Sequence, residues 1–118
     1  MRLPRERLQD ILDAIDAVER YAVRGRGAFD RDELIPVWMC YHIRIVGDAA
    51  RTLPDTVRAQ APEVPWRLVI GMRHMIVHSY PTIDQNEIWD TATRDLPAMR
   101  LLVERLIAFV EGAPGGAA

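Results

Sequence analysis

Apolar residues recur at steps of three and four along most of the chain, which is the spacing of one helix face. The first such stripe lies between Pro4 and Val23 and consists of Leu8, Ile11, Leu12, Ile15, Val18 and Ala22. Charged residues fill the opposite face of this segment. Gly25-Arg26-Gly27 interrupts the pattern, so we expect the first helix to end before it.

A second helix is expected to begin at Asp30, because Glu33 three residues later completes a capping box. Its apolar stripe consists of Leu34, Val37, Trp38, Tyr41, Ile45 and Ala49. Pro36 lies too deep for a first-turn proline, so the sequence predicts either a kink there or a later start. Leu53-Pro54 ends the helix. The segment from Asp55 to Gln60 is long enough for a short helix.

The second half of the chain predicts two more long helices. Pro65 suits the first position of a helix that carries Trp66 to about Ser79. A last helix opens at Asp84, with Glu87 as the partner in a second capping box. Its stripe consists of Ile88, Leu96, Met99, Leu102, Val103, Leu106 and Val110.

Pro97 falls inside the last helix and should kink or divide it, with Asp95 available as a cap. No strand-length run of alternating polarity lies between turns. We therefore expect an all-α fold, an antiparallel bundle of four main helices plus a short one. Residues 1–111 form the expected domain, and residues 112–118 form an expected disordered tail.

The composition narrows the class of protein. A chain of 118 residues is the size of one domain, and 49% hydrophobic residues exclude a disordered chain. The single cysteine, Cys40, excludes an internal disulfide framework and favours a reducing cytoplasm. No apolar run suggests a signal peptide or a membrane span, so we expect a cytoplasmic protein without a membrane partner.

Charge excludes a generally basic nucleic-acid-binding surface, because the net charge is −2. A local site is still compatible with this balance. All 15 basic Lys+Arg residues are arginine. Biased genome composition is the main explanation for the absence of lysine. As a consequence, every basic Lys+Arg side chain carries a planar guanidinium group, whose N–H groups suit phosphate or carboxylate oxygens.

The segment from 66 to 79 concentrates basic side chains on one face. At 100° per residue, Leu68, Val69, Met72, Met75 and Ile76 share an apolar arc that should face the core. Opposite this arc lie Arg67, Gly71, His74 and His78, with Arg73 at the flank. No acidic residue occurs between Glu63 and Asp84, although acids outnumber bases in the chain.

Three interpretations of this face are open. The first is a polar helix face with incidental histidines. The second is a metal site shared by His74 and His78, and the third is an acid/base site for a phosphodiester. The metal site is disfavoured because HMIVH lacks the glutamate of HExxH and a third ligand would have to come from afar. For the phosphodiester, histidine titrates near neutral pH and arginine offers a fork to phosphate oxygens.

The segment from Arg73 to Tyr80 reads R-x4-H-x-Y, and here the sequence resembles HepT-like toxins of the HEPN superfamily. His74 occupies the position after the arginine, where the family commonly has a polar residue. The surroundings match the family's layout at Pro65-Trp66, Ile70-Gly71-Met72, Ile83-Asp84, Trp89 and Leu96-Pro97. Val46-Gly47-Asp48-Ala49 resembles the family's I-G-E-A, with Asp48 in place of glutamate.

The resemblance implies a homodimer whose motif helices meet near a two-fold axis. It also implies metal-independent RNA cleavage, with Arg73 and His78 catalytic, His74 and Arg67 in support, and no cofactor. Arg73 and His78 lie about 140° apart on the helix, so two copies across the axis are needed to combine them.

The resemblance extends to regulation. It implies the toxin of a type VII-like toxin–antitoxin pair, neutralised when an MntA-like nucleotidyltransferase antitoxin adds AMP to Tyr80. Pro81 should push Tyr80 out of helical geometry and leave its hydroxyl beside His78.

Other interpretations remain. The alternative function is a non-catalytic helical dimer that binds nucleotides or a partner. The Cys40 thiol is expected to be unreactive. The Trp66 side chain, at the start of its helix, is expected to fix the preceding turn. Arg44 and Arg51 could widen a basic cleft, although Asp48 between them suggests ordinary pairing along the helix.

Overall fold

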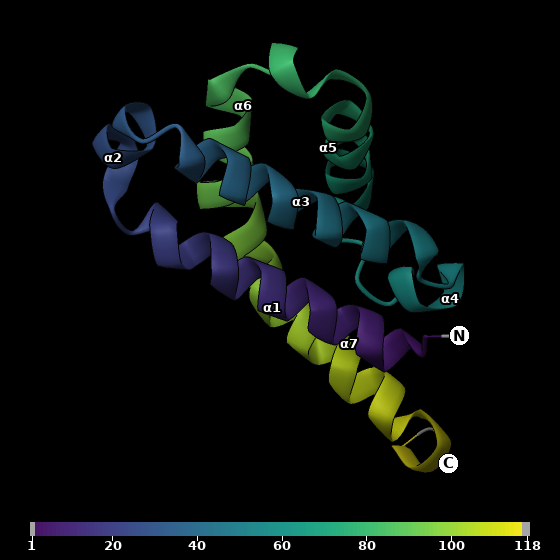
Figure 1. Cartoon of the computed structure of the whole chain (residues 1–118). Helices are drawn as coiled ribbons and strands as arrows, with labels where there is room; N and C mark the ends of the chain where they lie inside the picture. Colours follow the sequence, from purple (N-terminus) through teal and green to yellow (C-terminus); the bar gives the residue numbers. More distant parts are fainter. Residues whose placement is uncertain (1, 117–118) are drawn as a thin grey trace.

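The computed structural model describes residues 2–116 and the side chains of residues 2–112. Every element in this part of the chain is helical, which confirms the all-α class. The long helices are α1 (Pro4–Ala22), α3 (Leu34–Thr52), α5 (Trp66–Ser79) and α7 (Leu96–Gly116) (Figure 1). The shorter elements are α2 (Gly25–Arg31), α4 (Asp55–Arg58), η1 (Tyr80–Thr82), α6 (Gln85–Asp90) and the π-helical η2 (Thr91–Asp95).

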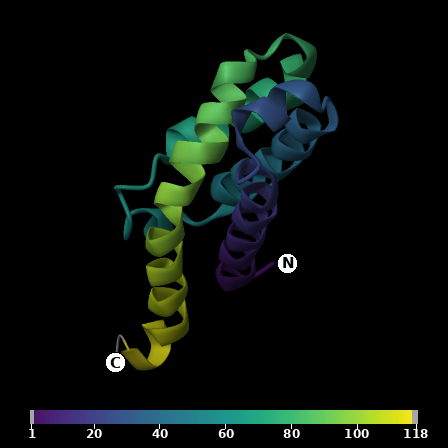
Figure 2. The same ribbon diagram turned by 90° about the vertical axis from the view of Figure 1, so that its left-hand side faces the viewer.

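Helix α3 lies at the centre of the bundle, between α1 on one side and α5 on the other. Helices α1 and α7 run side by side in both ribbon views (Figure 2). Their opposite directions bring Arg5 near the start of α1 within 2.8 Å of Glu111 near the end of α7. Within the described residues, no helix combines the length and apolarity needed to cross a bilayer.

The first predicted helix agrees with the structure. Leu8, Ile11, Ile15 and Val18 are fully buried, and Leu12 and Ala22 pack partly against the same core. The acidic face of α1 also stabilises the bundle, because Asp16 and Glu19 both pair with Arg100 of α7. The 3.6-residue period therefore located both the helix and its buried face.

Helix α2 was not predicted, and the helix expected to begin at Asp30 begins only at Leu34. Gly25 turns the chain at a φ of +88°, and the following residues then form α2. Phe29 anchors α2, since its ring is buried 5.1 Å from that of Trp89. Asp32 accepts the N–H of Leu34 and opens α3. The later start places Pro36 in the first turn, where no kink is needed.

The buried stripe of α3 was also predicted wrongly. Leu34, Val37 and Tyr41 are exposed, and Trp38 and Ile45 are only partly buried. Of the predicted stripe only Ala49 is buried. The core is formed instead by Ile35, Pro36, Met39, Cys40, Ile43, Val46, Gly47, Ala49 and Ala50. Helix α3 is apolar almost all round in its first half, so period alone does not identify its covered face.

The last predicted helix is divided near Pro97, as expected, and no capping bond from Asp95 is among the described contacts. The chain continues from α6 through η2 into α7, and the wide π-turn precedes the proline. Such a turn accommodates the missing N–H and the bulk of the ring. Asp84 caps α6 by accepting the N–H of Asn86, and the described contacts include no reciprocal bond from Glu87.

Two further expectations concern the segment after α3 and the C-terminal end of the chain. The short helix predicted within residues 55–60 is α4, and Trp66 closes the following turn by donating to the carbonyl of Ala61 at 3.0 Å. Helix α7 reaches Gly116, while residues 117 and 118 lie outside the described residues. The disordered tail at 112–118 therefore stays a prediction.

Candidate functional site

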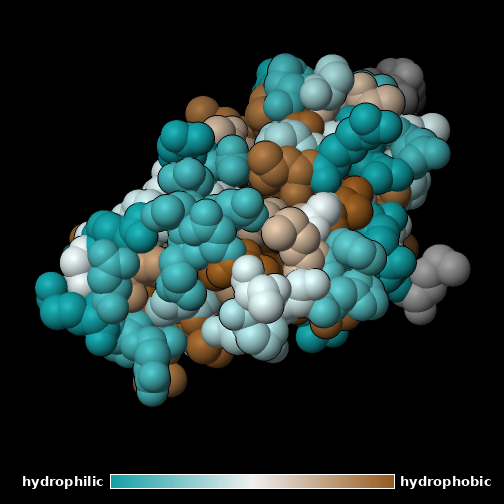
Figure 3. Space-filling model, turned by 90° about the horizontal axis from the view of Figure 1, so that it is seen from above, coloured by the Kyte–Doolittle hydropathy of each residue, from teal (hydrophilic) through white to brown (hydrophobic). Residues whose placement is uncertain are grey.

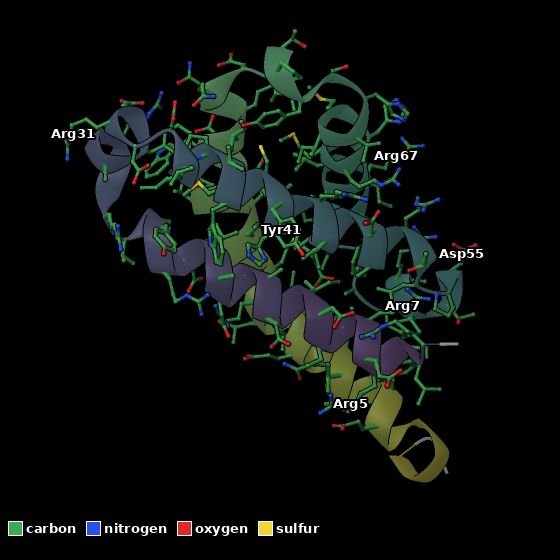
Figure 4. All side chains as sticks on the ribbon, in the orientation of Figure 1. Arg5, Arg7, Arg31, Tyr41, Asp55 and Arg67 are labelled. Atoms are coloured by element: carbon green, nitrogen blue, oxygen red, sulfur yellow. The ribbon has the colours of Figure 1, made fainter. Side chains whose placement is uncertain are left out.

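Helix α5 presents its basic residues on two different sides. Arg67, His74 and His78 are exposed on its outer side, and Arg67 points outward at the edge of the molecule (Figure 4). The rings of His74 and His78 lie 4.4 Å apart between centroids. These three predicted site residues therefore share one solvent-facing strip.

The apolar arc of α5 is narrower than predicted. Val69, Met72 and Ile76 are buried and Met75 is partly covered, but Leu68 is exposed. Among the long helices of the described chain, α5 packs chiefly against α3, and Leu68 lies on the flank of the arc that this packing leaves exposed. Viewed from above, the surface of the molecule carries apolar patches between polar side chains (Figure 3).

Arg73 turns away from the histidines and toward α3. Its Nε donates to Oδ1 of Asp48 at 2.6 Å, and only 21% of its side chain is exposed. Oδ2 of Asp48 lies 3.7 Å from Nε of Arg44, one turn earlier on α3. The carboxylate thus sits between two guanidiniums, and it keeps Arg73 in one orientation.

Gly47 makes this pairing possible. A Cβ at Gly47 would overlap the Cβ of Arg73 and lie 2.7 Å from the carbonyl oxygen of Val69. Only a residue without a side chain lets α3 and α5 approach so closely. The sequence Val46-Gly47-Asp48-Ala49 therefore acts as a contact element, in which Gly47 admits Arg73 and Asp48 binds it.

Arg73 and His78 have no described contact with each other within one chain. Arg73 faces α3, whereas His78 faces solvent beside His74. This arrangement agrees with their separation of about 140° on the helix. The sequence predicts pairing of Asp48 along its own helix, and Arg44 does lie 3.7 Å away. The stronger partner, Arg73, is distant in sequence, and only the packing of α3 on α5 brings it to Asp48.

Tyr80 differs from the expectation in its backbone and its surroundings. It keeps helical angles, with φ −44° and ψ −50°, and the break falls instead at Ser79, with φ −144°. Burial, and secondarily the nearby thiol of Cys40, raises the pKa of the Tyr80 hydroxyl. The residue is 37% exposed, and no described contact joins it to His78.

The thiol of Cys40 is buried, which agrees with its expected inertness. Burial raises the pKa of the Cys40 thiol to about 11, so the sulfur is protonated at neutral pH. No group of three or more His, Cys, Asp or Glu side chains in the described part of the chain is placed to hold a metal ion.

Comparison with known proteins assigns the chain to a family. Residues 11–106 match the family model described as Ribonuclease HepT-like. The protein named Probable ribonuclease HepT from Thermococcus cleftensis is 26% identical over 114 residues, which cover 89% of this chain and 96% of the relative. The protein named "Putative RNase MJ1380" from Methanocaldococcus jannaschii is 30% identical over 98 residues, which cover 82% of this chain and 90% of the relative.

The all-α bundle and the matched region together define the class: this chain belongs to the HepT-like ribonuclease family. The match covers α3 and α5 completely and therefore includes every residue of the candidate site. The resemblance inferred from R-x4-H-x-Y is confirmed at the level of the family. No solved structure shows a significant match to this chain.

Proposed function

We propose that this chain is a metal-independent endoribonuclease that works as a homodimer and serves as the toxin of a toxin–antitoxin pair. The observation that carries the proposal is the division of the basic residues over two sides of α5. Arg73 is held against α3 by Asp48, whereas His78 stands free with His74 on the outer side. A second copy is needed to bring an arginine and a histidine to the same phosphate.

The reaction follows from these two side chains. The ribose 2′-hydroxyl attacks the adjacent phosphorus, and its proton passes to a base. The bond from phosphorus to the 5′-oxygen breaks, and that oxygen takes up a proton. His78 performs a proton transfer, and Arg73 stabilises the extra negative charge of the phosphorane. The products are a 2′,3′-cyclic phosphate and a 5′-hydroxyl, and DNA is not cleaved because it lacks the attacking group.

The exposed apolar face of α3 supports self-association. Leu34 is 69% exposed and Tyr41 57%, and Val37 is exposed beside them. Val77, in the last turn of α5, and Tyr80 are exposed as well. An isologous contact over this face would cover apolar surface next to Arg73, which is where a composite site requires the partner.

Light scattering at micromolar concentration should give a mass of about twice 13.4 kDa. Tyr41→Glu places a charge in the proposed contact and should shift the protein to the monomer. Leu101→Glu is the matched control, because Leu101 is 71% exposed on α7, away from this face. A monomeric wild type, or a dimer that Tyr41→Glu leaves intact, contradicts the proposed interface.

Tyr80 is the proposed site of AMP addition by a cognate nucleotidyltransferase antitoxin. The added group would place bulk and negative charge at the end of α5, two residues beyond His78, where it repels a substrate phosphate. Co-expression with the antitoxin should add the mass of AMP to the wild type and to Tyr41→Phe. It should leave Tyr80→Phe unmodified and toxic. An unmodified Tyr80 in a neutralised complex would mean inhibition by occlusion alone.

A further inference from the structure

The pairing of Arg73 with Asp48 includes a third residue, Arg44, that neither the motif nor the resemblance assigns to the site. We propose that Arg44 and Arg73 together bind one phosphate of a single-stranded RNA, with Asp48 holding the two guanidiniums apart from each other. The inference rests on the proposed function, since it names a further substrate-binding residue at the same site.

Each arginine approaches the carboxylate of Asp48 with its Nε atom, and each faces a different carboxylate oxygen. Nε of Arg73 lies 2.6 Å from Oδ1 of Asp48, and Nε of Arg44 lies 3.7 Å from Oδ2. Within the part of the chain whose side chains are described, the Nη atoms of Arg44 and Arg73 form no hydrogen bond. Each guanidinium therefore keeps its terminal fork free for another oxyanion.

The charges of this cluster fit one phosphodiester. Two guanidiniums side by side repel each other, and the carboxylate between them offsets that repulsion. The three side chains together carry one positive charge, which one phosphate group neutralises. Arg73 is mostly covered and fixed by the α3–α5 contact, whereas half of the Arg44 side chain is exposed and free to close over a ligand.

An ordinary ion pair along the helix explains Arg44 less well. Arg26 and Asp30 are also an Arg–Asp pair at i and i+4, and their contact is 2.8 Å. The contact between Arg44 and Asp48 is longer, at 3.7 Å, and is not a hydrogen bond, whereas Arg73 does donate to the same carboxylate. An exposed pair of that length adds little to stability, so Arg44 is free to contact a ligand.

Affinity for RNA tests the inference independently of cleavage. The probe is a single-stranded 2′-O-methyl oligonucleotide, which binds but cannot be cleaved, and fluorescence anisotropy is recorded over a salt series. Arg44→Ala should bind about tenfold more weakly, with a shallower salt dependence by about 0.7 in log–log slope. Arg44→Lys should recover only part of the affinity, because an ammonium keeps the charge but not the fork. The matched control Arg26→Ala should bind as the wild type does.

The outcomes separate the inference from the proposed function. A wild type that binds the probe through Arg44 but does not cleave unmodified RNA contradicts the ribonuclease while leaving the inference intact. Equal affinity and salt dependence of Arg44→Ala and Arg26→Ala overturn the inference, even if the wild type cleaves. A wild type that does not bind the probe overturns it too. Circular dichroism of each variant excludes unfolding as the cause of a loss.

Discussion

Arg73→Ala and His78→Ala should each lower the rate of RNA cleavage by at least about 10²–10³-fold, the usual effect of removing one group that stabilises a transition state. Neither side chain is part of the buried apolar face of α5, so both variants should keep the helical fold. The measurement is cleavage of a single-stranded RNA in the presence of a chelator. Arg31→Ala is the control, since Arg31 is exposed on α2, far from Arg67 in Figure 4.

Three results would change this assignment. Cleavage that survives in His78→Ala excludes His78 as the essential acid or base. A loss of helical circular dichroism in Arg73→Ala would instead give Arg73 a structural role through Asp48. Cleavage that the chelator abolishes would contradict a metal-independent reaction.

Among replacements of a helix glycine by alanine, Gly47→Ala should cause the largest loss of stability. The new Cβ overlaps Arg73 and the carbonyl of Val69, and backbone atoms cannot yield as a flexible side chain does. Helices α3 and α5 must separate, at a cost of about 3 kcal/mol in the free energy of unfolding. Denaturant unfolding followed by circular dichroism measures the change.

Gly71→Ala is the matched control on the partner helix. A Cβ at Gly71 meets no atom within 4 Å, so the substitution adds helix propensity without overlap. It should raise the free energy of unfolding by about 0.5–1 kcal/mol. Equal effects of Gly47→Ala and Gly71→Ala would contradict the close contact between α3 and α5.

Helices with one polar and one apolar face were predictable from the sequence. In α1 the charged residues occupy one face, so only the opposite face, with Leu8, Ile11 and Ile15, could be buried. The structure buries these three side chains. In α3 the same rule failed, because apolar residues such as Leu34 and Tyr41 occupy the exposed side too. Helix α2 was missed because local glycines suggested a break, while the tertiary contact of Phe29 with Trp89 stabilises a helix.

The candidate site was predictable only where it is local in sequence. The spacing of Arg73, His74 and His78 placed the two histidines together on one face, and the structure agrees. The partner of Arg73 is Asp48, and only the packing of two helices at Gly47 joins them. In the proposed dimer His78 meets Arg73 across the interface, and no spacing within one chain determines such a contact.

The composite site is tested most directly by a mixed dimer. Arg73→Ala and His78→Ala chains are co-expressed with different tags, purified through both tags, and assayed for RNA cleavage. If each site takes Arg73 from one protomer and His78 from its partner, the mixed dimer holds one intact site of two. It should then recover about half of the wild-type rate while both parent variants stay inactive. A mixed dimer as inactive as its parents would contradict a site shared between protomers.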